Sequence, residues 1–218
     1  MRILLGLLLA FELLNCLGQA AIIADPDGYT NVREQPNSKS KILYQVKNFE
    51  VFLISEQEGE WVEVFIPRNK FSIYDTPEQY IRGFMHQSRI RQLENLKIYT
   101  GTNFKFSYTI KTFNPEEHII QWEDDKYVTF IDGQYVWGTD GDFPKNEIAK
   151  IEIELDGRKI PISPTLYSNL FECDNNFKIY ELDSVFFIEQ WNSDGAGGYL
   201  LVWTVNENGV VQRVLMKP

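Results

Sequence analysis

The stretch Ala-Asp-Pro-Asp-Gly-Tyr-Thr-Asn-Val-Arg at residues 24–33 combines a turn with a strand. Proline fixes its own φ angle and glycine permits a chain reversal, so residues 25–28 predict a tight turn. Residues 29–33 and the alternating run 61–66 predict short strands, and the alternation places Trp61, Glu63 and Phe65 on one face. Short strands at such close spacing favour a small β-barrel. The other strands predicted in this region are residues 42–46, 51–54, 83–85 and 89–90.

Two Asp-Gly pairs in the second half of the chain predict β-hairpins. Asp132-Gly133 separates the β-rich runs 127–131 and 134–137, and Asp156-Gly157 separates the runs 149–155 and 158–162. Pro161 cannot donate a ladder hydrogen bond, which makes its strand an edge strand. Only residues 164–171 favour a helix. The remaining strands are predicted at residues 183–191, 199–205 and 210–215. The predicted fold class is therefore all-β and mainly antiparallel, a small barrel at residues 21–95 followed by a sheet or sandwich at residues 96–218.

Composition and charge exclude several classes of protein. The chain has 218 residues, 44% of them hydrophobic, which is enough apolar material for a globular core. Its 21 basic and 31 acidic residues give a net charge of −10, which argues against binding to nucleic acid or to an anionic membrane. Two Cys and two His leave little for a zinc site and nothing for a disulfide framework, so no metal and no cofactor are predicted.

The first twenty residues predict export. Met1 and Arg2 precede nine uncharged apolar or small residues, Glu12 interrupts the run, and small residues follow up to Ala20 and Ala21. This order is typical of a secretory signal peptide, with cleavage expected after Ala20, and the run is too short to cross a bilayer. An uncleaved N-terminal anchor is the alternative. The protein is therefore predicted to be periplasmic or secreted.

Residues 13–16, Leu-Leu-Asn-Cys, resemble a bacterial lipoprotein box. That resemblance implies a lipid on Cys16, and the protein would be bound to a membrane only in that case. Asn15 departs from the pattern, which has Gly, Ala or Ser before the cysteine. Cleavage after Ala20 would remove Cys16 and leave Cys173 as the one thiol of the chain.

Four segments of the first region resemble bacterial SH3-type domains in order and spacing. Residues 24–33 are similar to the opening of that family and residues 36–42 to the loop that follows. Trp61-Val62-Glu63-Val64 resembles its central W-x-x-V strand, and residues 83–90, Gly-Phe-Met-His-Gln-Ser-Arg-Ile, resemble its closing strand. The resemblance implies a barrel over residues 21–95. In the second region, residues 137–141 and 193–203 resemble only an uncharacterised extension that follows such domains.

An insert at residues 67–82 departs from the SH3-type pattern. Thr76 and Pro77 predict the start of a helix, as cap and first residue. The resemblance puts this loop near the binding groove, which the insert would either cover or enlarge.

The resemblance also implies a peptide-binding groove lined by aromatic side chains. The residues predicted to bind the ligand are Tyr29, Asn31, Arg33, Trp61, Tyr80 and Phe84. Two alternatives remain open: Trp61 and Phe84 belong to the barrel core, or Arg33 braces the turn by pairing with Asp25 or Asp27.

No catalytic residue is predicted. Cys173 lies between Glu172 and Asp174, which would raise the pKa of its thiol, and His118 precedes it, the reverse of the order in Cys-His peptidases. Cys173 is predicted to be a free thiol and His118 an exposed side chain. The acidic runs 116–117 and 123–125 are expected to be solvated loops rather than glycosidase pairs. The Asp-Gly and Gly-rich segments 140–142 and 192–198 predict turns rather than calcium or phosphate sites.

The sequence therefore predicts an exported, non-catalytic binding protein of the bacterial cell envelope, whose partner is peptidoglycan peptide or an envelope protein. One alternative is an inhibitor or immunity-like protein, because an acidic protein suits capture of a basic exported hydrolase. A second alternative is a cell-wall enzyme that uses carboxylates of the second region.

Overall fold

The structure is a computed structural model that describes residues 19–55, 59–71, 77–193 and 195–216. Within these residues the chain forms seventeen strands and six short 3₁₀ turns, and all pairings between the strands are antiparallel. The all-β prediction is confirmed. The 3₁₀ turns are η1 (Pro77–Gln79), η2 (Gln87–Arg89), η3 (Leu93–Asn95), η4 (Pro115–Glu117), η5 (Pro164–Leu166) and η6 (Gly195–Gly197).

The N-terminal barrel is a seven-stranded sheet in the order β3-β2-β6-β5-β4-β1-β7. Its strands alternate as the sequence predicts, so Val32, Val62, Val64 and Met85 point into a buried cluster while their neighbours point outward. The strands are β1 (Gln19–Ile22), β2 (Tyr29–Arg33), β3 (Ile42–Lys47), β4 (Phe52–Ile54), β5 (Trp61–Pro67), β6 (Tyr80–His86) and β7 (Arg91–Gln92).

Strand β1 was not predicted, and it includes the last two residues of the predicted signal segment. Gln19 pairs with Ile54 and Ala20 pairs with Leu53, and Ala20 is buried. Cleavage after Ala20 would therefore divide this strand. The rest of the segment, including Cys16, lies outside the described residues.

The C-terminal region consists of three antiparallel sheets, with the orders β11-β10-β9, β13-β12-β8 and β14-β15-β16-β17. Aromatic side chains join the last two face to face, as in the parallel stack of Phe104 and Phe186 with ring centroids 4.1 Å apart. The strands are β8 (Phe104–Thr112), β9 (Ile120–Glu123), β10 (Tyr127–Ile131), β11 (Gln134–Tyr135), β12 (Asn146–Leu155), β13 (Arg158–Ile160), β14 (Lys178–Leu182), β15 (Val185–Asn192), β16 (Tyr199–Asn206) and β17 (Gly209–Met216).

Both predicted Asp-Gly hairpins are confirmed. Asp132 and Gly133 have φ angles of 52° and 73°, and Asp156 and Gly157 have 51° and 76°, the left-handed pair that a two-residue hairpin turn requires. Strand β13 ends before Pro161 and lies at a sheet edge, as predicted. The predicted helix at residues 164–171 is wrong beyond its start, because only the single turn η5 forms.

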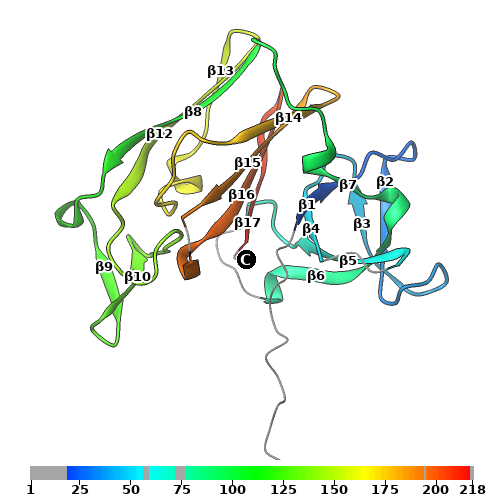
Figure 1. Cartoon of the computed structure of the whole chain (residues 1–218), viewed down its shortest axis with the longest axis horizontal. Helices are drawn as coiled ribbons and strands as arrows, with labels where there is room; N and C mark the ends of the chain where they lie inside the picture. Colours follow the sequence, from blue (N-terminus) through cyan, green and yellow to red (C-terminus); the bar gives the residue numbers. More distant parts are fainter. Residues whose placement is uncertain (1–18, 56–58, 72–76, 194, 217–218) are drawn as a thin grey trace, which may run out of the picture.

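The four-stranded sheet β14–β17 lies between the barrel and the sheet β13-β12-β8, and Figure 1 shows this arrangement. Along β16, Leu200 and Val202 face the barrel, while Leu201 and Trp203 face the other sheet. Burial on both faces explains the nearly continuous apolar sequence of this strand. The barrel and the C-terminal region thus share a buried cluster, which includes Ile22 from the barrel.

Two neighbouring residues of β17 connect the C-terminal region to the barrel by hydrogen bonds. The side-chain amide of Gln212 accepts a hydrogen bond from the Val51 N–H and donates one to the Val51 carbonyl, both at 2.8 Å. The backbone N–H of the fully buried Arg213 donates to the Lys70 carbonyl at 2.7 Å. The described parts of the insert therefore contact β17, and η1 begins at Pro77 as predicted, while Thr76 lies outside the described residues.

Candidate functional site

The outward side of the barrel strands β2, β5 and β6 brings together five of the six predicted ligand-binding residues. Register places Arg33 opposite Phe84, and Phe84 opposite Glu63, in one line across the three strands. Trp61 lies two residues along β5 from Glu63, opposite His86. We call this surface the outer barrel face: Tyr29, Asn31, Arg33, Trp61, Glu63 and Phe84.

Tyr29 and Asn31 form one end of the outer barrel face. The Tyr29 ring is exposed, and the Lys47 ammonium from β3 lies 5.4 Å from its centroid. The Asn31 side-chain oxygen accepts a hydrogen bond from Gln45 at 3.1 Å. An aromatic face beside a cation and an amide can stack on an apolar ligand group and also hydrogen-bond to a peptide.

Trp61 and Phe84 do not belong to the barrel core. Both are half-buried, and the inward positions between them are occupied by Val62 and Met85. The Trp61 ring meets the His86 ring edge to face, with centroids 5.5 Å apart. Because His86 of the neighbouring strand supports one side of the Trp61 ring, the exposed side of that ring is held in a fixed orientation for contact with a ligand.

Arg33 does not brace the turn. Its guanidinium donates to the Ser40 carbonyl at 2.6 Å, whereas Arg89 makes the ion pair with Asp25 at 2.7 Å. The Asp27 amide also donates to the Asp25 carboxylate, and this bond, followed by those from Thr30 and Arg89, lowers the pKa of Asp25 despite its burial. Sequence analysis missed Arg89 because it lies 64 residues from its partner.

Tyr80 is not on the outer barrel face. Its hydroxyl donates to the Leu215 carbonyl of β17 at 2.9 Å, and its ring packs against the cluster shared by the two regions. The insert was expected to cover or enlarge the groove, but its described residues lie against β17 instead. Residues 72–76 of the insert lie outside the described part of the chain.

A cleft of about 440 Å³ lies between β1 of the barrel and β15 of the C-terminal sheet. It is lined by Glu94, Glu189 and the exposed Trp191. Burial raises the pKa of Glu189, although a hydrogen bond from Tyr180 at 3.1 Å opposes this. No sequence signal could predict this cleft, because its lining comes from segments far apart in the chain.

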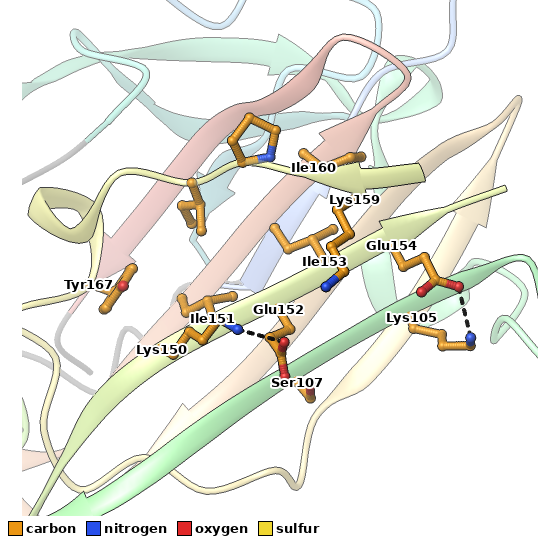
Figure 2. A pocket seen from close by; sticks show the side chains of 12 residues that line it. Lys105, Ser107, Lys150, Ile151, Glu152, Ile153, Glu154, Lys159, Ile160 and Tyr167 are labelled. Atoms are coloured by element: carbon orange, nitrogen blue, oxygen red, sulfur yellow. Dashed lines mark hydrogen bonds and ion pairs between the residues drawn. The ribbon is translucent and has the colours of Figure 1, made fainter. Parts of the chain in front are cut away.

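A second hollow, of about 630 Å³, lies beside the edge of β12 where β13 stops (Figure 2). Lys105 pairs with Glu154 at 2.8 Å, and Lys150 pairs with Glu152 at 2.7 Å. The Lys150 ammonium lowers the pKa of Glu152. These carboxylates are therefore engaged by lysines of their own sheet.

Cys173 and His118, which were predicted to be a free thiol and an exposed side chain rather than a catalytic pair, lie in two different environments. Cys173 is buried, burial raises the pKa of its thiol to about 12, and its sulfur lies 3.0 Å from the Tyr199 hydroxyl. Such a thiol is a poor nucleophile at neutral pH. His118 is not exposed as predicted: it stacks on Phe113 with centroids 4.8 Å apart.

His118 also bridges two carboxylates. Its Nδ1 lies 2.7 Å from Asp132 and its Nε2 lies 3.3 Å from Glu147. Burial by itself would lower the pKa of His118, but the hydrogen bonds to Asp132 and Glu147 outweigh it and the pKa is raised.

Replacing His118 with glutamine should therefore destabilise the protein more at low pH than at high pH. A raised pKa contributes stability that is complete below the unfolded value of about 6.5 and disappears as the pH rises through the folded value. We expect the loss of unfolding free energy to be about 1 kcal/mol greater at pH 5.5 than at pH 8.5. Urea unfolding of both proteins at the two pH values measures this difference, and an equal loss at both would contradict the bridging role.

The acidic runs that were predicted to be solvated loops lie at the surface. The acidic residues Glu116, Glu123, Asp124 and Asp125 are exposed, and Glu117 pairs with Lys111 at 3.1 Å.

Among the described residues there is no group of three or more His, Cys, Asp or Glu side chains placed to hold a metal ion. No helix in the described ranges has the length and apolar character needed to cross a membrane.

Comparison with known proteins agrees with the geometry of the barrel. No curated protein and no solved structure matches this chain. The family model for the bacterial SH3 domain matches residues 28–91, which include β2–β6, the first residue of β7 and all residues of the outer barrel face. The N-terminal barrel of this chain is therefore a bacterial SH3 domain.

Proposed function

We propose that this protein is an exported, non-catalytic binding protein of the bacterial cell envelope, and that its SH3 domain binds the peptide part of peptidoglycan. The observation that supports this most directly is the outer barrel face. Tyr29, Trp61 and Phe84 present part of each ring to solvent on adjoining strands of one sheet. The domain itself supports a role at the cell wall, since a bacterial SH3 domain suggests a wall-binding module.

An extended peptide could lie across β2, β6 and β5 and contact these rings in turn. Asn31 offers a hydrogen-bond acceptor, while the Glu63 carboxylate is paired with Arg82. Lys47 and Arg33 offer cations for the carboxylates of a peptide. A partner protein in the envelope that presents an extended segment would use the same surface.

Replacing Tyr29 with alanine should weaken binding to purified sacculi about two- to twelvefold, because a stacked aromatic ring contributes about 0.5–1.5 kcal/mol beyond its burial. The measurement is the fraction of protein that sediments with sacculi as their concentration is raised. Tyr127→Ala is a matched control: Tyr127 is 43% exposed against 39% for Tyr29, and each ring has a lysine ammonium above it.

Two results would count against this proposal. In one, the wild-type protein stays in the supernatant with sacculi of the producing bacterium. In the other, Tyr29→Ala sediments as the wild type does while Tyr127→Ala does not.

A further inference from the structure

Residues 113–147 account for most of the net negative charge of the molecule. They include nine acidic and two basic residues, a net charge of −7 out of −10 for the chain. This segment forms η4, the small sheet β9–β11 and the loop that leads to β12. In Figure 1 the hairpin of β9 and β10 lies at the far end of the molecule from the barrel. We call residues 113–147 the acidic tip.

Exposed apolar side chains gather in the same segment. Of the eight large hydrophobic side chains that are exposed in the described chain, the acidic tip has four: Ile119, Trp122, Tyr127 and Phe143. Trp122 and Phe143 contact each other edge to face, with ring centroids 5.3 Å apart. All residues from 121 to 127 are exposed, so the hairpin end projects into solvent. Exposed aromatic side chains that support each other are typical centres of protein interfaces.

Much of the acidic charge forms no ion pair among the described residues. Lys111 pairs with Glu117 and with Glu147, each at 3.1 Å, while His118 engages Asp132. In contrast, Asp124, Asp125 and their neighbours have no ion pair with any described residue. The carboxylates of this unpaired group are Glu116, Glu123, Asp124, Asp125, Asp140 and Asp142. The negative electrostatic potential of these unpaired carboxylates therefore extends into the solvent.

The turn between β9 and β10 has Asp125 at its second position, where the backbone favours glycine. Asp124 and Asp125 have φ angles of 52° and 53°, and the Lys126 N–H donates to the Glu123 carbonyl at 3.1 Å. Such a two-residue turn favours Asn-Gly, because asparagine and glycine adopt positive φ at lower cost. The two charges are thus a feature that the turn does not itself require.

We propose that the acidic tip is a docking surface for a basic protein, with Trp122 and Phe143 at its apolar centre and the unpaired carboxylates around them. Charge complementarity selects the partner: opposite charge speeds encounter, and burial of the aromatic pair then holds the complex. A nucleic acid or an anionic membrane would be repelled by the same field. This surface is separate from the outer barrel face, so the proposal does not depend on the wall-binding proposal.

The partner can be identified and tested in two steps. A photo-reactive phenylalanine analogue is placed at position 122, or at position 191 as a control, in cells that naturally produce the protein. Trp122 and Trp191 are matched, being 47% and 49% exposed. Cross-linked proteins are identified by mass spectrometry, and the captured protein is purified for binding measurements.

Position 122 should give a specific adduct with a protein of high isoelectric point, and position 191 should not. The Kd of the purified pair should rise about tenfold or more between 50 and 300 mM salt, and about tenfold with Trp122→Ala. The double variant D124N/D125G should weaken binding at low salt by a similar factor. Because Asn-Gly suits the turn, this variant should unfold at the same or higher urea concentration than the wild type, so weaker binding cannot be attributed to unfolding.

Three results would overturn the proposal. The first is no adduct at position 122, or the same adducts at both positions. The second is capture of an acidic protein or of a second copy of this chain. The third is a purified complex whose Kd changes less than twofold with salt and with D124N/D125G.

Discussion

Replacing Gln212 with leucine should lower the free energy of unfolding by about 3 kcal/mol. The side chain is buried, and its amide forms two hydrogen bonds with the backbone of Val51, 161 residues away in sequence. The Gln212 side chain thus supplies Val51 with the two hydrogen bonds that the backbone of a neighbouring strand would otherwise provide. Leucine has a similar size but leaves the Val51 N–H and carbonyl buried without a partner, and each such group costs about 1–3 kcal/mol.

Urea or guanidinium unfolding followed by tryptophan fluorescence measures the effect. Gln45→Leu is the matched control, because Gln45 also donates a side-chain hydrogen bond, to Asn31, but it is exposed. Its loss should be below about 1 kcal/mol. A loss below 1 kcal/mol for Gln212→Leu would show that the bonds to Val51 contribute little to the contact between the barrel and the C-terminal sheet.

The elements that sequence analysis predicted correctly are those whose cause is local. Asp132-Gly133 and Asp156-Gly157 define their hairpins because both residues adopt positive φ, a property of the dipeptide itself. The alternation at residues 61–66 places Trp61 outward and Val62 inward because the strand period is two, whatever the partner strand. The outer barrel face was predictable for the same reason.

The elements that were missed depend on partners far away in the chain. Strand β8 alternates clearly in apolar and polar residues, but its partner β12, which pairs with it along nine residues, begins more than thirty positions after β8 ends. Strand β1 directly follows the apolar run of the predicted signal segment, so its residues could not be recognised as a separate strand from the sequence. Tyr80 was assigned to the ligand because aromatic residues in an SH3-type loop suggest a groove, but its hydroxyl reaches a carbonyl 135 residues away.

The acidic tip could be predicted from the sequence only in part. Its acidic runs were correctly predicted to be exposed, but sequence alone could not show that Trp122 and Phe143, 21 positions apart, contact each other among those acids. A surface of this kind depends on which apolar residues remain uncovered, and that becomes visible only when the rest of the fold is assembled.

A chain that begins at Ile23 should be largely unfolded, whereas a chain that begins at Gln19 should keep the stability of the protein. Strand β1 lies between β4 and β7 in the barrel sheet, and Ala20, Ala21 and Ile22 are buried. Its removal would open the sheet on both sides, leave ladder groups of β4 without partners, and take Ile22 out of the cluster shared with the C-terminal region. These losses sum to about 5 kcal/mol or more, comparable with the whole stability of a typical domain.

Circular dichroism and urea unfolding of the two chains test this expectation, and equal stability would show that β1 is dispensable.

If the protein is exported as proposed, β1 also limits where the signal segment can be cleaved. Cleavage after Ala20 would leave only Ala21 and Ile22 of β1, so we expect the mature protein from producing cells to begin at or before Gln19. Intact-mass measurement gives its first residue and shows whether Cys16 is retained with a lipid. A mature chain beginning at Ala21 that unfolds at the same urea concentration as the chain beginning at Gln19 would contradict a structural role for the first half of β1.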